Sequence, residues 1–223
     1  MVAEIGLRAR KKQQTRQAIF DSARRLFAGR RFEDVTVAEI ARAANVSEVT
    51  VFNYFPTKED LFYGGMQFFE EDLLEAVRTR PRGESAIKAF RRRLLEGTDA
   101  LGSKERIAAI TKAGETVSAS PSLVAREREI VERYTQRLAE LLAADAKSDP
   151  GDVEPMAAAA AMMGAHRAMV DYVRRRVRAG RKGPALAEDA RAQIRRAFAR
   201  LERGLGDYAV RPNPPASPRA GKS

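Results

Sequence analysis

The stretch 36-TVAEIARAANVSEVTVFNYFP-56 contains two helix starts with very little chain between them. Thr36 and Glu39 have the spacing of a capping box, and Ser47 is a second N-cap residue. Pro56 disfavours helical backbone in the residue before it, so the second helix must end there. Between the two helices lies a three-residue turn centred on Asn45, a residue that tolerates left-handed backbone angles. Two short helices joined in this way are predicted to form a helix-turn-helix.

The rest of the chain is also expected to be helical, so the predicted fold class is all-α. Apolar residues recur at helical spacing, and no stretch alternates apolar and polar residues for long. We expect a first helix that starts between Lys11 and Thr15 and ends at about Ala28, where it would brace the helix-turn-helix. A helix from Lys58 to about Thr79 should bury Phe62, Met66, Phe69, Leu73 and Val77. Further helices are expected at about 85–100, 104–118, 121–145, 154–180 and 186–205.

These elements suggest a small N-terminal helix-turn-helix domain of three helices and a larger C-terminal helical domain. We expect a basic N-terminal arm over residues 1–12, the helix-turn-helix over 13–57 and the larger domain over 58–206. Residues 207–223 end in RPNPPASPRAGKS, a composition typical of disordered chain ends.

The second short helix carries an unusual set of residues for its length. At 100° per residue, Val51 and Phe55 point inward, whereas Val49, Asn53 and their neighbours Thr50 and Tyr54 point outward. Asn can pair bidentately with adenine, Val and Thr can touch a thymine methyl group, and Tyr can donate to phosphate. The net charge of +11, from 41 Lys and Arg against 30 Asp and Glu, also suggests a polyanionic partner. The alternatives are a surface helix with incidental polar residues and a composition that simply favours arginine.

Lys58 is an odd residue for a helix start. Thr57 is an N-cap candidate and acids follow it, yet Lys58 places a cation at the positive end of the helix dipole. A DNA phosphate at that end would offset this cost, so we predict that Lys58 binds one. The alternative is a solvated surface lysine.

Residues 13–62 resemble the DNA-binding domain of the TetR family of bacterial transcriptional regulators. The resemblance rests on Val46-Ser47, Thr50-Val51-Phe52, Tyr54-Phe55 and Lys58, with Thr36 and Ile40-Ala41 upstream. Phe52 stands where the family usually has tyrosine and Tyr54 where histidine is usual, so the hydroxyl that could reach phosphate has moved. Glu48 could accept from cytosine N4 or only serve the helix N-terminus. The expected DNA-binding residues are Arg10, Lys11, Thr36, Ser47, Glu48, Val49, Thr50, Phe52, Asn53, Tyr54 and Lys58.

The resemblance further implies a ligand-binding and dimerisation role for the larger domain. The implied protein is a homodimeric repressor that binds a palindromic DNA operator and is released by a small apolar inducer. The expected pocket residues are Phe69, Phe90, Ile110, Tyr134, Met163 and His166, although each could equally be plain core. The small residues of the 154–180 helix would let a second copy approach, or else serve packing within the chain. The expected interface residues are Ala160, Gly164, Arg167, Ile194, Phe198 and Leu201, and His166 could line either the pocket or the interface.

Other function classes find little support in the sequence. The chain has no cysteine and one histidine, so we expect no metal site, no cofactor and no enzyme activity. No apolar run approaches the length of a membrane span, and a cytoplasmic protein is expected. Two alternatives to the ligand-released repressor stay open. One is a constitutive or architectural DNA-binding protein of the same fold, and the other is a helical protein-interaction module.

Overall fold

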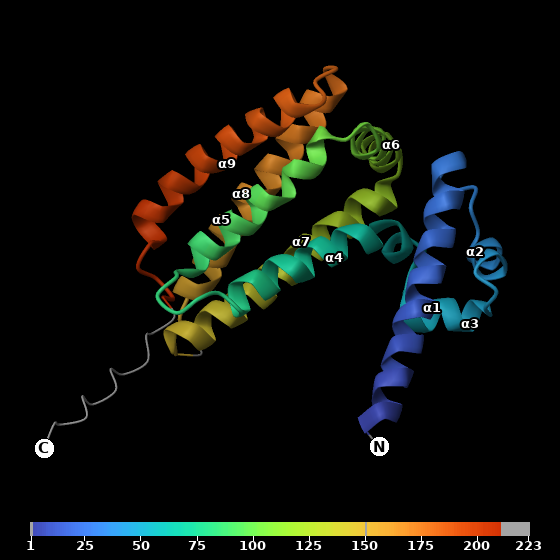
Figure 1. Ribbon diagram of the computed structural model, residues 1–223, viewed down its shortest axis with the longest axis horizontal. Helices are drawn as coiled ribbons and strands as arrows, with labels where there is room; N and C mark the ends of the chain where they lie inside the picture. The colour runs from blue at the N-terminus through green and yellow to red at the C-terminus, as the bar shows by residue number, and fades with distance from the viewer. Residues whose placement is uncertain (1, 150, 211–223) are drawn as a thin grey trace, which may run out of the picture. The chain divides into compact units, whose positions relative to one another are not determined.

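The computed structural model describes residues 2–149 and 151–210, and within these ranges it is all-α (Figure 1). One isolated β-bridge pairs Ser85 with Val210. No helix in the described ranges is both long and apolar enough to cross a membrane. The helices are α1 (Val2–Gly29), α2 (Val37–Ala43), α3 (Glu48–Tyr54), α4 (Lys58–Arg78), α5 (Ala86–Gly97), a 3-10 helix η1 (Asp99–Gly102), α6 (Lys104–Ala119), α7 (Pro121–Ala146), α8 (Glu154–Arg178) and α9 (Pro184–Leu205).

Two of the expected helix boundaries are wrong. α1 already begins at Val2, so the predicted basic arm is helical from that residue onward. Its Ala, Leu, Arg, Lys and Gln residues favour helix and it contains no proline, although residues 6–14 are all exposed. The helix expected over 85–100 ends at Gly97 and gives way to η1. Gly97 is a poor helix former, and the Thr98 hydroxyl donates to the Leu95 carbonyl at 2.6 Å instead of facing solvent.

The chain folds into two compact units, and both are discontinuous in sequence. The first unit comprises Met1–Phe69 and Lys112–Ile130, and the second comprises Glu70–Thr111 and Val131–Ser223. The boundaries between the units therefore lie inside α4, α6 and α7, whereas the sequence suggested one boundary between residues 57 and 58.

The first unit has an aromatic core between α1, the α1–α2 loop and the start of α4. Phe27, Phe32 and Phe62 pack against one another with ring centroids 5.3 to 5.9 Å apart. α1 and α4 also approach closely at Gly64, where a Cβ atom would stand 2.6 Å from the Phe20 ring. α2 and α3 lie beside α1 (Figure 1). This core holds the two short helices at a fixed place on α1 and α4.

The buried face of α4 is broader than predicted. Leu73 and Val77 are buried as expected, but Phe62, Met66 and Phe69 are only partly buried. The fully buried apolar positions also include Leu61, Tyr63 and Leu74. Apolar periodicity thus located the face of this helix only to within about one residue.

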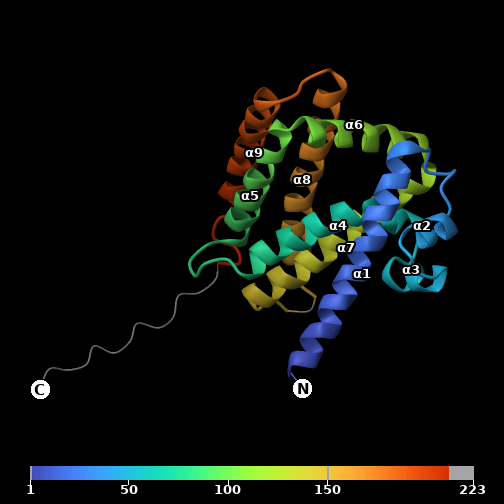
Figure 2. The ribbon, with the colours of Figure 1, turned by 45° about the vertical axis from the view of Figure 1, so that its right-hand side comes forward.

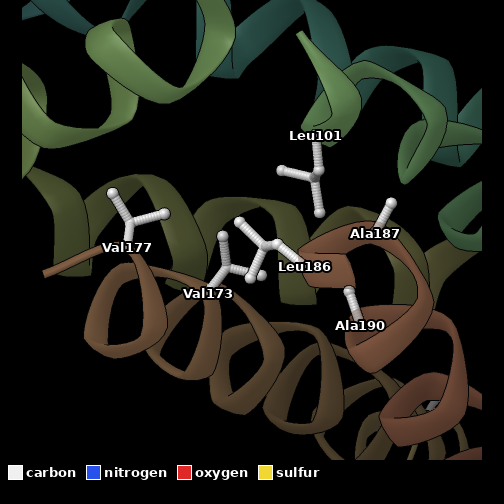
Figure 3. Packing of buried hydrophobic residues seen from close by; sticks show 6 residues of the cluster. All are labelled: Leu101, Val173, Val177, Leu186, Ala187 and Ala190. Carbon is white, nitrogen blue, oxygen red and sulfur yellow. The ribbon is translucent and has the colours of Figure 1, made fainter. Parts of the chain in front are cut away.

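The second unit is built on α5, α8 and α9, which lie side by side (Figures 1 and 2). Phe90 of α5 stacks on Phe198 of α9, with ring centroids 5.9 Å apart and an interplanar angle of 26°. At the other end of this layer, apolar side chains of α8, α9 and η1 converge (Figure 3). That cluster consists of Leu101, Val173, Val177, Leu186, Ala187 and Ala190.

Residues 207–210 are ordered, which corrects the start of the predicted disordered tail. The Arg80 side chain is fully buried and donates to the carbonyl of Ala209 at 2.7 Å. Its guanidinium also pairs with Asp145 at 2.7 Å, and Val210 forms the bridge to Ser85. A buried guanidinium needs such acceptors, so it ties this segment to the second unit. The remaining tail residues, 211–223, lie outside the described residues.

Candidate nucleic-acid interface

The turn and caps of the helix-turn-helix are as the sequence predicted. The Glu39 amide donates to the Thr36 hydroxyl at 3.2 Å, and the Thr36 amide donates to the Glu39 carboxylate at 2.9 Å. A hydrogen bond from Arg30 and one from the Thr36 amide lower the pKa of Glu39 to about 2. Asn45 has φ of 55°, in the left-handed region that the turn requires. The Thr50 amide donates to the Ser47 hydroxyl at 3.1 Å, so α3 is capped by the expected residue.

The outward arc of α3 is confirmed for Val49 and Asn53, but only in part for Thr50 and Tyr54. Val51 and Phe55 are buried, whereas Asn53 is exposed and Val49 and Phe52 are 69% and 46% exposed. Single exposed apolar residues are common, so what distinguishes α3 is that two of them stand beside Asn53 on one short helix. Among the other predicted α3 residues, Glu48 is exposed and Thr50 and Tyr54 are half-buried.

The hydroxyl groups of this region are largely engaged within the protein. The Ser47 and Thr50 hydroxyls are 2.8 Å apart, and the Thr36 hydroxyl donates to the Glu39 carboxylate at 3.0 Å. Arg10 and Lys11 are exposed on the N-terminal part of α1. That these residues contact DNA stays a prediction.

Lys58 lies where the sequence predicted, at the first position of α4, but its ammonium group has protein partners. Its Nζ donates to the carbonyl of Phe32 at 3.0 Å and to that of Val35 at 3.2 Å. It also stands 4.3 Å from the centroid of the Phe32 ring. The sequence predicted either a phosphate contact or a solvated side chain for Lys58. Neither prediction included these backbone carbonyls. A cation at the wrong end of a helix dipole was the signal that it has a specific partner.

The start of α4 carries the predicted Thr57 cap and, in addition, an ion pair that the sequence did not reveal. The Asp60 amide donates to the Thr57 hydroxyl at 3.1 Å, and the Thr57 amide donates back to the Asp60 carboxylate at 3.2 Å. The buried Asp60 carboxylate also accepts from Arg126 of α7 at 2.8 Å and from Gln67 at 3.1 Å. Burial would raise the pKa of Asp60, but hydrogen bonds from Arg126 and Thr57 outweigh it and hold the pKa below its usual value.

The corner between α6 and α7 belongs to the same unit as the helix-turn-helix. The buried Tyr63 hydroxyl donates to the carbonyl of Leu123 at 2.9 Å. Hydrogen bonds from a backbone amide and from Ser120 lower the pKa of Glu33, which lies in the α1–α2 loop. With the Arg126–Asp60 pair, these interactions join residues 112–130 to the start of α4 and to the α1–α2 loop.

The predicted ligand-pocket residues are mostly enclosed. Phe69 belongs to the first unit and is half-buried, and Ile110 of the second unit is also half-buried. The His166 ring stands edge-on to Phe90 with centroids 6.4 Å apart, and burial lowers the pKa of His166 to about 4, with a smaller effect from Arg167. Burial and the charge of Glu71 raise the pKa of Tyr134 to about 12. The remaining predicted residue, Met163, is buried.

Two of the predicted dimer residues are wrong. Ile194 and Phe198 are only 2% and 1% exposed in the single chain, and Phe198 stacks on Phe90 within the second unit. An apolar stripe on α9 can face one neighbour only, and here that neighbour is the chain's own core. Ala160 and Gly164 are exposed on α8, while Arg167 and Leu201 are half-buried. Among the described residues, no group of three or more acidic or histidine side chains is placed to hold a metal ion.

Comparison with known proteins agrees with this geometry. A model of the bacterial regulatory proteins of the tetR family matches residues 19–63, which include part of α1, all of α2 and α3, and the start of α4. The HTH-type transcriptional regulator TcmR of Streptomyces glaucescens is 35% identical over 85 residues. The match spans 38% of this chain and 38% of TcmR, so it covers well under two thirds of that protein.

Two solved structures share the fold over most of their length. A TetR transcriptional regulator from Rhodococcus sp. RHA1 has a TM-score of 0.52 at 21% identity, covering 86% of this chain and 98% of that one. NalD, the secondary repressor of the MexAB-OprM multidrug efflux pump in Pseudomonas aeruginosa, has a TM-score of 0.52 at 22% identity, covering 85% and 96%. Residues 19–63 are thus similar to the bacterial regulatory proteins of the tetR family, and the chain shares its overall fold with two solved regulators.

Proposed function

We propose that this protein is a sequence-specific DNA-binding regulator of transcription. It acts as a homodimeric repressor on a palindromic operator and is released by a small apolar ligand. The observation that carries the proposal is the exposed arc of α3, with Val49 and Asn53 at its centre.

The arc has the chemistry of a major-groove surface. An α-helix with its side chains is about 10–12 Å in diameter, and the major groove is about 12 Å wide, so α3 can enter it. Asn53 can pair with adenine through its amide, and Val49 can contact the methyl group of thymine. The exposed cations of α1, Arg10 and Lys11 among them, would add phosphate contacts that strengthen binding to any duplex.

A homodimer is supported by the exposed face of α8. Ala157, Ala160, Gly164 and Ala168 are exposed at helical spacing, and a Cβ atom added to Gly164 would meet nothing within 4 Å. Small residues let another helix approach closely, and a two-fold interface uses the same face of both copies. We therefore place the interface on this face of α8, without Ile194 and Phe198.

A ligand site is supported by the composition of the second unit's interior. Phe90, Met163 and an uncharged His166 are buried there, so a ligand among them would have to be largely apolar. Release requires that the ligand bind the DNA-free form more tightly than the DNA-bound form.

Selection from a pool of random duplexes tests the DNA part of the proposal. The purified protein should enrich a sequence with two related half-sites separated by about one helical turn, or a multiple of it. Light scattering should show a dimer in solution. Salt-dependent binding without enrichment would instead indicate an architectural protein, and no duplex binding at all would indicate an interaction module.

A ligand screen on the selected duplex tests release. Compounds that lower DNA affinity should themselves bind more weakly, by the same factor, when the duplex is present. Ligands of the second unit that bind equally well with and without the duplex would refute ligand release while leaving DNA binding intact.

A further inference from the structure

The ammonium group of Lys58 holds the loop between α1 and α2. Its two hydrogen bonds, at 3.0 and 3.2 Å, go to carbonyl oxygens of Phe32 and Val35, so they tie both halves of one short turn. The ring of Phe32 lies beneath the same ammonium at 4.3 Å and belongs to the buried aromatic core of the first unit. Lys58 therefore joins the start of α4 to a segment 23 to 26 residues earlier in the chain.

The loop that Lys58 holds leads directly into α2. The Val35 amide donates to the Phe32 carbonyl at 3.4 Å, and Thr36 then caps α2 through Glu39. Arg30 pairs with Glu39 and also donates to the carbonyl of Asp34. The position of the loop thus sets the position of the α2 N-terminus, and α3 follows α2 after a three-residue turn.

We propose that Lys58 is a positioning residue for α2 and α3, and that it contributes to DNA reading through the loop and not through a phosphate of its own. This inference rests on the proposed DNA-binding function. Two of the three ammonium donors are already used, and the charge is satisfied by carbonyl dipoles and an aromatic face.

Positioning and phosphate binding affect different kinds of affinity. Pairing with a base edge depends steeply on hydrogen-bond distance and angle, so a displaced α3 loses specific binding. Binding to random DNA depends on the number of cations near phosphates, and this number also sets the slope of affinity against salt. A lost loop contact should therefore lower specific affinity alone.

The test compares three variants on the selected duplex and on a random duplex, over a range of salt concentrations. Lys58→Met removes the donors and the charge. Lys58→Gln removes the charge but keeps two N–H donors, one bond closer to the backbone. Lys112→Met is the matched control, because it removes one positive charge from an exposed lysine of the same unit.

We expect Lys58→Met to weaken binding to the selected duplex by roughly tenfold or more. Its random-duplex affinity and salt slope should match those of Lys112→Met, and Lys58→Gln should recover part of the specific affinity. Equal losses on both duplexes, with a slope lower by about one counterion per subunit than the control, would overturn the proposal in favour of a phosphate contact. Unchanged affinities with a lower melting temperature would overturn it in favour of a purely stabilising role.

Amide hydrogen exchange of the free protein provides a readout that needs no DNA. Lys58→Met should speed exchange over residues 30–46 relative to Lys112→Met, because the loop has lost its anchor. Exchange identical to that of the control would overturn the proposal. If the wild-type protein selects no sequence from the duplex pool, the proposed function fails, and the exchange experiment still decides whether Lys58 holds the loop.

Discussion

The helix-turn-helix and the three-helix layer of α5, α8 and α9 differ in the solvent exposure of the side chains to which the sequence drew attention. α3 places Val49 and Phe52 in solvent on a helix of only seven residues. The layer encloses Phe198, and even its histidine, in its own interior. Single exposed apolar residues are common on protein surfaces, so it is the grouping of Val49 and Phe52 with Asn53 on one short helix that suggests an external partner, whereas enclosure is explained by folding alone.

The two regions also differ in how their geometry is specified. The helix starts and the turn of the helix-turn-helix are set by local rules, namely the Thr36 and Ser47 caps and the left-handed Asn45. The packing of the layer depends on apolar periodicity. This pattern shows that one face of a helix is buried, but not which element packs against it. Local specification makes α3 a firm platform for recognition, and the following substitutions test each side of the contrast.

The largest expected effect is on assembly of the layer into a dimer. Gly164→Leu should weaken the dimer by about 2–6 kcal/mol, because an overpacked residue costs roughly 1–3 kcal/mol and a two-fold interface contains it twice. Sedimentation at several concentrations measures the dimer dissociation constant. Ala108→Leu, at an exposed position of α6, is the control and should change it little.

The monomer should tolerate Gly164→Leu, since nothing lies within 4 Å of the added Cβ atom. An unchanged dissociation constant would therefore remove the exposed α8 face from the interface and leave the layer with no demonstrated external partner.

The enclosed histidine should make the layer acid-sensitive. Burial lowers the pKa of His166 from 6.5 to about 4, so between these values the unfolded chain takes up a proton that the folded chain does not. The free energy of unfolding should fall as the pH drops through this window, by up to about 3 kcal/mol, and show no His166 effect above it. Urea unfolding at a series of pH values, compared with His166→Gln, measures the contribution. Identical pH profiles for the two proteins would mean that the imidazole titrates normally.

In the first unit, Gly64→Ala should lower the free energy of unfolding by about 2 kcal/mol. The new Cβ atom would stand 2.6 Å from the Phe20 ring, so α1 and α4 must separate or the ring must turn. Urea unfolding measures the loss. No loss would mean that the aromatic core between α1 and α4 can rearrange at little cost. The support beneath α3 would then be less rigid than the capped helices suggest.

The neighbouring position gives the smallest expected effect, of opposite sign. Gly65→Ala meets the Phe20 ring only at 3.4 Å, an ordinary contact. Replacing glycine with alanine inside a helix should then stabilise the protein by up to about 1 kcal/mol. Destabilisation comparable to that of Gly64→Ala would show that the distinction between the two glycines is wrong.

The same contrast explains what could be predicted from the sequence. The α2 and α3 boundaries, the Asn45 turn and the outward arc of α3 follow from interactions within a few residues, and all were predicted. Ile194 and Phe198 were predicted to face a second copy of the chain. An apolar stripe shows only that a helix face is buried, and not which element covers it. The partners of Lys58 are backbone carbonyls in a distant loop, and no residue type encodes them. The Asp60–Arg126 pair spans 66 residues and depends on tertiary packing in the same way.

If α3 reads bases, replacing Asn53 should affect binding to a specific sequence and spare binding to random DNA. The affinities of wild type and Asn53→Ala are measured on the selected duplex and on a random duplex at matched salt. We expect Asn53→Ala to lose roughly 1–3 kcal/mol of binding free energy on the selected duplex and almost none on the random one. Equal losses on both duplexes, or no loss on the selected one, would contradict base reading by Asn53 and the assignment of the exposed arc to DNA.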